Sequence, residues 1–267
     1  RDFCLSRGLG DVYKRQDNGF WDTFRSQFPL TNILHPTMQG RYMNALLAAQ
    51  EQCGWLPSWS APGETGGMLG NHSISLLADA WAKGIRTFDP EKALKAYAHE
   101  AMNKGPWGGA NGRGFWKEYF ELGYVPYPES MGSSAQTMEY AYDDFVLAQV
   151  LQKLETSDDY FPDPQKTGLY DTLMIRARYY RNVINPSTGY AQGRYADGSF
   201  LTDAGNAFSF TRFITEGAPC HYTWYAPHDI YGLMECMGGK EKYIAKLDSM
   251  FSEHCLLYTS PSPRDRQ

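Results

Sequence analysis

The sequence has few cysteines and no apolar run long enough to cross a bilayer. Of its five cysteines, those away from the chain ends are Cys53, Cys220 and Cys236, and their spacing matches no zinc-binding motif. At most one disulfide can form among these three, so cysteine content says little about the cellular compartment. Because no apolar run reaches the length of a transmembrane helix, we expect no membrane span.

Basic residues are also fewer than acidic ones, at 25 Lys and Arg against 30 Asp and Glu. A net negative chain offers no electrostatic reason to bind nucleic acid, so we expect no nucleic-acid partner. The glycine-rich stretch from Gly105 to Gly114 lacks the spacing of a Walker phosphate loop and predicts an ordinary loop. Aromatic residues make up 15% of the chain, which argues against disorder and suits both a large core and a carbohydrate site.

The two ends of the chain have the sequence of a translated adaptor. Residues 6–16 (S-R-G-L-G-D-V-Y-K-R-Q) and 255–265 (C-L-L-Y-T-S-P-S-P-R-D) can be encoded by opposite strands of one oligonucleotide, identified as a transposase sequencing adaptor. We therefore expect residues 1–16 and 255–267 to be non-native tails and treat residues 17–254 as one domain. Without the six basic and three acidic residues of these tails, the net charge changes from −5 to −8.

Apolar periodicity predicts an all-α fold of about eight helices joined by long loops rich in glycine, proline and aromatic residues. Helix starts are indicated by Pro36, by Asp89-Pro90 and by Ser133 or Ser134, and a helix end by Gly238-Gly239. One short hairpin is expected from Tyr190 to Phe200. The expected helices include residues 36–52, 71–83, 133–154, 168–183, 228–237 and 240–251.

The same periodicity predicts which residues face the core. The stripes expected to be buried are Met38, Tyr42, Ala45 and Leu46 in the helix from Pro36, Ile74, Leu77, Ala78 and Trp81 in residues 71–83, and Tyr243, Ile244, Leu247 and Phe251 in residues 240–251. Asp79 and Lys83 are expected to pair at i,i+4.

The stretch from Phe213 to Gly239 contains one acid that stands out by its surroundings. Glu216 lies next to Phe213, Ile214 and Gly217, and such neighbours are expected to desolvate a carboxyl group and favour its protonated form. A protonated carboxylic acid can act as a general acid. The aromatic residues that follow suit sugar rings, whose C–H faces pack on aromatics. The alternative is a helix-capping acid followed by an aromatic core helix.

This stretch resembles a known family. T-E-G followed by Y-T-W-Y-A-P-H-D-I-Y-G-L-M-E-C-M-G-G-K-E is similar to the general-acid segment of glycoside hydrolase family 92, the calcium-dependent exo-acting α-mannosidases. Further matches, in family order, are residues 21–25 (W-D-T-F-R), 70–73 (G-N-H-S), 78–81 (A-D-A-W) and 139–144 (E-Y-A-Y-D-D). Together they cover nearly everything from about Gly19 to Phe251.

The resemblance implies both a fold and an activity. The fold would be an (α/α)6 toroid of helical hairpins, of which this chain is an incomplete part, about the first two-thirds of the barrel, with a β-sandwich domain upstream. The activity would be inverting hydrolysis of terminal α-linked mannose, α-1,2-linked in our expectation, from glycans such as N-glycans. The enzyme would be bacterial and secreted, periplasmic or on the cell surface. Its cofactor would be calcium, which bridges two hydroxyls of the terminal mannose.

The resemblance also assigns site residues. Glu216 matches the general acid, and the substrate-binding residues would be Trp21, Asp22, Arg25, His72, His221 and Asp229. From the residues alone, Asp22 and Arg25 also suit a structural ion pair, and His72 also suits a helix cap. Calcium ligands are not assigned, although the acids Glu139, Asp143 and Asp144 suit either a hard cation or structural partners such as arginine.

Two departures from the family pattern limit what this chain is expected to do. The family's general base lies in a downstream G-N-x-D-x-G-Q stretch, and neither that stretch nor H-G-N-E-P occurs in this sequence. Residues 218–221 (A-P-C-H) replace the family's N-x-W-Q. We therefore expect this chain alone to be inactive. The alternatives are another (α/α)6 glycosidase or lyase, and a non-catalytic sugar-binding relative.

Overall fold

The computed structural model describes residues 19–60, 64–106, 111–128, 130, 132–155 and 164–252. The chain divides into two compact units, residues 1–114 and residues 115–267. The tails expected to be non-native lie outside the described residues. In the part of the chain that the structure describes, no helix has both the length and the apolarity needed to cross a membrane.

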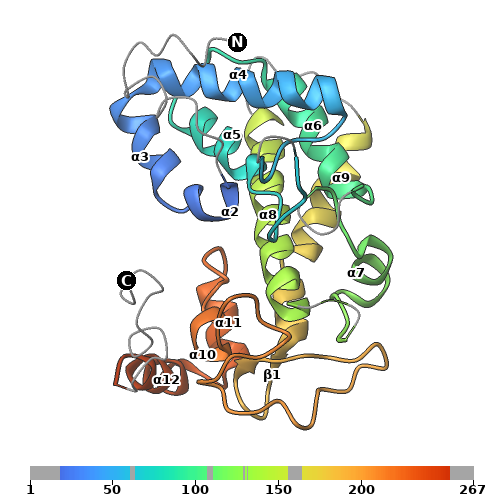
Figure 1. Cartoon of the computed structure of the whole chain (residues 1–267), viewed down its shortest axis with the longest axis vertical. Coiled ribbons are helices and arrows are strands. Elements are labelled where there is room, and N and C mark those ends of the chain that lie inside the picture. Colours follow the sequence, from blue (N-terminus) through green and yellow to red (C-terminus); the bar gives the residue numbers. More distant parts are fainter. Residues whose placement is uncertain are drawn as a thin grey trace, which may run out of the picture. The chain divides into compact units, whose positions relative to one another are not determined.

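The described chain is mostly helical, as the sequence predicts, with one two-stranded antiparallel sheet. In chain order its elements (Figure 1) are α2 (Phe20–Thr23), α3 (Gln27–Leu34), α4 (Pro36–Cys53), α5 (Ser73–Ala82), α6 (Pro90–Met102), α7 (Trp116–Leu122), α8 (Ser133–Glu155), α9 (Pro164–Arg176), the 3-10 helix η2 (Tyr179–Val183), β1 (Ile184–Asn185), β2 (Tyr190–Ala191), α10 (Pro219–Tyr222), α11 (Ile230–Cys236) and α12 (Lys240–Ser252).

The first unit packs α3, α4, α5 and α6 against one another. Pro36 begins α4 and Gly54 ends it in the left-handed conformation. Asp89 caps α6 as predicted, because its carboxylate accepts the backbone N–H groups of Glu91 and Lys92 at 2.9 and 3.1 Å. These helix boundaries follow from local capping chemistry and therefore agree with the sequence prediction.

The predicted buried stripe of α4 is wrong by one residue. Met38, Tyr42 and Ala45 are exposed, whereas the face with Met43 and Leu47 is buried, and Leu46 alone of the predicted stripe is buried. The buried face also carries Gln39 and Gly40. A Cβ atom on Gly40 would lie 2.0 Å from Oγ1 of Thr87, so this face approaches the segment after α5 more closely than a larger side chain allows. Close packing selects the face with glycine over the face with larger apolar residues.

In α5 the prediction is correct for Ile74 and Leu77, which are buried, while Ala78 and Trp81 are only half-buried. Lys83 forms the predicted ion pair with Asp79, with Nζ and Oδ2 2.5 Å apart. The same Oδ2 atom also accepts a hydrogen bond from Nδ2 of Asn32 at 2.7 Å. Asp79 therefore joins α5 to α3 and serves the structure of the first unit.

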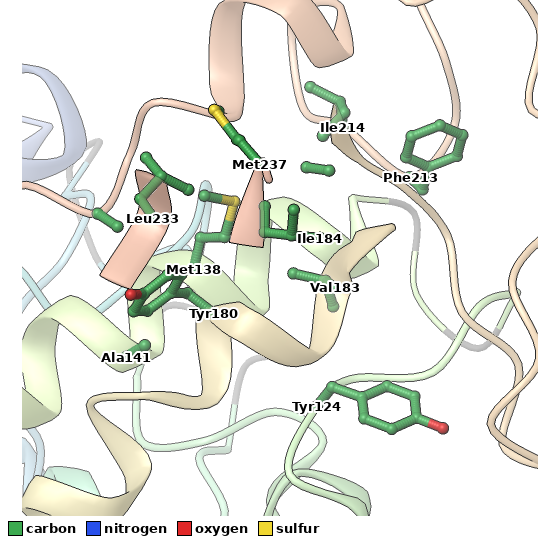
Figure 2. Packing of buried hydrophobic residues seen from close by; sticks show 12 residues of the cluster. Tyr124, Met138, Ala141, Tyr180, Val183, Ile184, Phe213, Ile214, Leu233 and Met237 are labelled. Atoms are coloured by element: carbon green, nitrogen blue, oxygen red, sulfur yellow. The ribbon is translucent and has the colours of Figure 1, made fainter. Parts of the chain in front are cut away.

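The second unit is arranged around α8, which packs against α9 and η2. Figure 2 shows its apolar core, to which Met138 and Ala141 come from α8, Leu233 from α11 and Tyr180 from η2. The predicted helix over residues 168–183 is instead two elements, α9 and η2. The remaining labelled members of this core are Tyr124, Val183, Ile184, Phe213, Ile214 and Met237.

The sheet is not where the sequence predicts a hairpin. β1 pairs with β2 around the turn of residues 185–189, with Ile184 opposite Ala191. Within the range of the predicted hairpin, Tyr190 to Phe200, the structure has the isolated bridge between Arg194 and Phe200. Asn185 closes the observed turn by accepting the N–H groups of Thr188 and Gly189 on its carbonyl oxygen.

The apolar side predicted for α12 is not buried in the described chain. Ile244 and Phe251 are 44% and 78% exposed, and Tyr243 and Leu247 are half-buried. The helix itself forms as predicted, from Lys240, after the left-handed glycines Gly238 and Gly239. Local sequence thus fixes this helix, which packs in the described chain through Tyr243 on Trp224, with ring centres 5.2 Å apart.

Candidate active site

The predicted site residues fall in both units. Trp21, Asp22, Arg25 and His72 belong to the first unit, while Glu216, His221 and Asp229 belong to the second. In the first unit α2 holds Trp21, which is half-buried, and Asp22, which is exposed; Arg25, just after α2, is also exposed. The segment that carries Ser58 holds this helix, because the N–H of Phe20 donates to the carbonyl of Ser58 at 3.0 Å.

An aromatic stack links three of these positions. The guanidinium of Arg25 lies 4.7 Å from the ring centre of Phe24 and 5.7 Å from that of Trp21. Phe24 stacks in turn on His72, with ring centres 3.8 Å apart and an angle of 7° between the planes. His72 is only 1% exposed; it occupies the N-cap position of α5, as the capping interpretation predicts, but without a side-chain cap hydrogen bond. The first unit therefore brings Trp21, Arg25 and His72 together around Phe24.

A buried acid that the sequence prediction missed supports the segment with His72. Glu100 of α6 is 1% exposed and accepts the backbone N–H groups of Leu56 and Gly112, each at 2.6 Å. Nδ2 of Asn71 donates to the same carboxylate at 3.3 Å, and Nη1 of Arg113 donates to Oδ1 of Asn71. Burial raises the pKa of Glu100 to about 7, against the opposing effect of the two backbone N–H bonds and the charge of Arg113.

In the second unit, the backbone at Glu216 is unusual. Glu216 has φ of +51°, in the left-handed region that non-glycine residues seldom occupy. Its side chain is exposed, so the expectation of a carboxyl group desolvated by its neighbours is wrong. Phe213 and Ile214 are instead buried in the core, at 2% and 4% exposed (Figure 2). The turn presents one exposed carboxyl group between buried flanking segments.

The chain after Glu216 is equally fixed. Ala218 and Pro219 are buried, and Pro219 begins the short helix α10. Nδ1 of His221 accepts the backbone N–H of Ala218 at 3.1 Å, so the neutral ring carries its proton on Nε2. Burial lowers the pKa of His221 and favours this neutral form. His221 is half-buried in α10 and lies five residues from Glu216 in sequence.

Asp229 has structural partners. It caps α11 by accepting the N–H of Gly232 at 3.0 Å, and its other oxygen accepts from the hydroxyl of Tyr180 at 2.8 Å and from Nη2 of Arg181 at 3.1 Å. Burial alone would raise the pKa of Asp229, but these hydrogen bonds and the arginine charge outweigh it and lower that pKa. This set of partners favours a structural role for Asp229 over contact with a sugar.

The acids of α8 are buried inside the second unit. Glu139, Asp143 and Asp144 are each 0% exposed. Asp144 pairs with Nη2 of Arg176 at 2.8 Å and accepts a hydrogen bond from the hydroxyl of Tyr119 at 3.0 Å. Of the two interpretations from the sequence, this one residue agrees with a structural arginine partner. Within the described ranges no three His, Cys, Asp or Glu side chains come together as metal ligands.

Sequence reasoning missed Glu100, although its position in the helix offered a signal. Glu100 lies on the same helix face as the buried residues Ala93, Ala96 and Tyr97. An acid within an apolar stripe is costly unless it is hydrogen-bonded, so its position on the stripe was the available signal.

Three comparisons with known proteins bear on this site. The model of the glycosyl hydrolase family 92 catalytic domain matches residues 4–262. The chain is 24% identical to an uncharacterized secreted glycosidase of Arthroderma benhamiae, over 97% of this chain and 37% of that protein. It is similar in structure to a family GH92 inverting mannosidase from Bacteroides thetaiotaomicron, with 40% identity, a TM-score of 0.78, and coverage of 87% of this chain and 30% of that one.

A second solved structure from Bacteroides thetaiotaomicron, a family GH92 α-mannosidase in complex with mannoimidazole, is 32% identical with a TM-score of 0.77. The match covers 91% of this chain and 30% of that chain. The chain thus spans about a third of the length of the relatives it matches.

Proposed function

The chain belongs to glycosyl hydrolase family 92, and from that premise we propose that it supplies the general acid of an inverting exo-α-mannosidase. The observation that carries the proposal is the turn at Glu216. A glutamate held at φ of +51° between buried segments, with its carboxyl group exposed, is a strained conformation that costs free energy. Such strain is found mainly where a side chain must be presented in one direction for function.

The role of Glu216 is proton donation to the leaving oxygen. In an inverting glycosidase one carboxylic acid protonates the glycosidic oxygen, and a second carboxylate, about 6.5–9.5 Å away, activates the attacking water. The bond from the anomeric carbon to the leaving oxygen breaks as the water oxygen attacks from the opposite face, so the configuration inverts. Glu216 performs only the first of these tasks.

The second carboxylate is the reason to expect this chain alone to be inactive. No G-N-x-D-x-G-Q stretch, which the family resemblance associates with the base, occurs in this sequence. We propose that the chain is part of an (α/α)6 toroid whose remaining helices supply that base. A general acid alone contributes about 10²–10⁴-fold, far less than a whole enzyme provides.

The proposed substrate is a glycan with terminal α-linked mannose, α-1,2-linked in our expectation, such as an N-glycan. Support comes from the relatives described as mannosidases and from the mannoimidazole bound in one of them. In the first unit, Trp21, Arg25 and His72 are proposed to contact the sugar, with exposed Asp22 available to bind hydroxyls. His221 is also a proposed sugar contact. Calcium remains a proposal from family membership, with no ligand assigned to described residues.

Further proposals concern the source and the location of the protein. We propose that the full-length enzyme is bacterial and is secreted, periplasmic or on the cell surface. The similarity to Bacteroides thetaiotaomicron enzymes supports the first, and the relative described as a secreted glycosidase supports the second. The ends of this chain, residues 1–16 and 255–267, are proposed to come from a sequencing adaptor, so a clone of the native gene is the material for testing.

The test is a Glu216→Gln variant of the full-length protein, assayed on two substrates. We expect a loss of about 10²–10⁴-fold on α-linked mannobiose, whose poor leaving group needs a proton. The loss should be much smaller on an α-mannoside with an activated aryl leaving group, which departs unassisted. NMR of the first-formed anomer should show inversion.

The outcomes separate the candidate roles. Equal loss on both substrates would make Glu216 an electrostatic or structural residue and remove the assignment as acid. No loss on either substrate would overturn the proposed site, and a full-length protein that binds mannose without hydrolysing mannosides would instead be the non-catalytic relative.

A further inference from the structure

We propose that Glu139 and Tyr222 form a positioning pair that fixes the carboxyl group of Glu216 by clamping both sides of its turn to α8. The proposal rests on the proposed function, because it gives these residues the role of orienting the carboxyl group of the general acid. The chain before Glu216 and the chain after it are both attached to the same helix, α8.

The chain before the turn is bound to the start of α8. Backbone N–H groups of Ser134 and Ala135 donate to the carbonyl of Phe213 at 3.1 and 3.4 Å, and the N–H of Gly132 donates to the carbonyl of Arg212 at 2.6 Å. Gly132 is required here, because its φ is +84° and a Cβ atom would lie 2.1 Å from Oγ1 of Thr215. Thr215 directly precedes Glu216, so this approach is close to the turn itself.

The chain after the turn is bound to α8 through a side chain. The hydroxyl of Tyr222, the last residue of α10, donates to Oε1 of Glu139, which is 0% exposed. A hydrogen bond to a buried carboxylate is stronger than one between neutral groups. The length of α10 is four residues, so fixing Tyr222 fixes the short segment that runs back to Glu216.

Two attachments explain how Glu216 keeps a strained conformation. A left-handed glutamate would relax if either flank were loose, because its neighbours could then adjust their own dihedral angles. With both flanks tied to one helix, the carboxyl group keeps a single direction. A general acid must lie within hydrogen-bond reach of the leaving oxygen, so this direction controls proton transfer.

The experiment compares Tyr222→Phe with the parent full-length protein on the same two mannosides used for Glu216. We expect activity on α-linked mannobiose to fall about tenfold, part of what a general acid contributes. Activity on the activated aryl mannoside should change less than twofold. Because both substrates are assayed with one preparation, their ratio does not depend on how much of the variant is folded.

The matched control is Tyr119→Phe. The hydroxyl of Tyr119 also donates to a buried carboxylate of α8, that of Asp144, at 3.0 Å, but Tyr119 lies on α7. This variant should leave the ratio of the two activities unchanged even where it lowers stability. Glu139→Gln serves as the conservative variant, because its amide oxygen still accepts the hydroxyl of Tyr222, and its ratio should stay close to that of the parent.

An unchanged ratio of the two activities in Tyr222→Phe would overturn the proposal. The same holds if the ratio changes in Tyr119→Phe or in Glu139→Gln as much as it does in Tyr222→Phe. The Glu216→Gln variant shows which idea has failed. If that variant changes the ratio and Tyr222→Phe does not, the positioning pair is wrong and the acid stands. If Glu216→Gln does not change the ratio, the proposed acid itself is wrong.

Discussion

Glu216 has a backbone conformation that suits glycine better than glutamate. At φ of +51° any side chain meets the following carbonyl group, which costs about 1–2 kcal/mol. A residue selected only for stability would be glycine at this position, and the neighbouring Gly217 shows that glycine is tolerated nearby. The retained carboxyl group therefore indicates a use for it other than holding the fold together.

The strain predicts that, at position 216, the usual order of stability, alanine above glycine, is reversed. In the full-length protein, Glu216→Gly should be more stable than Glu216→Ala by about 0.5–1 kcal/mol, because glycine releases the strain and alanine keeps it. Both variants lack the acid. Thermal denaturation midpoints measure the order.

Lys95 is the matched control for that ranking. It is exposed on α6, where Lys95→Gly should be less stable than Lys95→Ala by about 1 kcal/mol. If alanine were also the more stable residue at position 216, the left-handed conformation would not exist in solution.

His228 is a second residue whose environment has a measurable consequence. Its Nε2–H donates to the carbonyl of Ala177 at 2.8 Å, and its ring stacks on Phe145 with ring centres 5.1 Å apart. Burial lowers the pKa of His228, against the opposing effects of the Ala177 bond and the charge of Asp229. The neutral ring is therefore the form that the fold favours.

A lowered histidine pKa makes stability depend on pH in one direction. The stabilisation is complete above the unfolded pKa of about 6.5 and is lost as pH falls through the lower folded pKa, because the unfolded chain then binds the proton more strongly. His228→Gln keeps an N–H donor but cannot titrate. The parent should lose more thermal stability than this variant between pH 7.5 and pH 5, and parallel losses would contradict the prediction.

At the scale of the elements, α6 carries Glu100, which joins two loops. Its carboxylate accepts N–H groups from Leu56, which follows α4, and from Gly112, which precedes α7, and an amide N–H from Asn71. These loops lead into α5 and into the end of the first unit. Glu100 therefore determines the path of the segment that ends at His72.

Glu100→Ala should destabilise the first unit by about 3–5 kcal/mol, because it leaves buried N–H groups and the 0% exposed Arg113 without this carboxylate. Glu91→Ala on the same helix is the control and should cost less than about 1 kcal/mol, since its pair with Lys95 is exposed. Hydrogen exchange at the amides of Leu56 and Gly112 measures the local effect. Equal effects of the two variants would mean that Glu100 does not hold the loops.

Local signals predicted some elements and missed others for physical reasons. Pro36 and Asp89 mark helix starts because capping satisfies backbone groups within a few residues, which sequence reveals directly. The division between α9 and η2, and the choice of Met43 over Tyr42 as a buried residue, depend on contacts distant in sequence. Helical periodicity fitted both α4 faces, and only the close approach at Gly40 distinguishes them.

The same distinction holds for the candidate site. Glu216 stood out because its residue type and neighbours differ from the rest of the chain. Glu139 suited either a hard cation or a structural partner such as arginine, and its observed partner Tyr222 lies 83 residues away in sequence, so no local pattern connects them. Positioning residues are defined by such distant contacts.

For the whole molecule, several large apolar side chains remain exposed in the described chain, including residues of α3 and α12. Leu30, Ile33 and Leu34 of α3 are 55%, 67% and 58% exposed, and Phe251 of α12 is 78% exposed. The spacing of Leu30, Ile33 and Leu34 puts them on one side of α3. Contiguous apolar patches of this kind normally mark surfaces that another part of a protein covers.

If further helices of the proposed toroid cover these surfaces, the isolated chain should differ from the full-length protein in solution. We expect the isolated chain to bind the dye ANS and to show a broad thermal transition, because apolar faces without partners promote loose packing and association. Replacing Leu30, Ile33 and Leu34 together with glutamine should reduce dye binding by the isolated chain. The same substitutions in the full-length protein should destabilise it, since there they would be buried. A monomeric isolated chain that unfolds cooperatively without binding dye would show that its helices need no further partners.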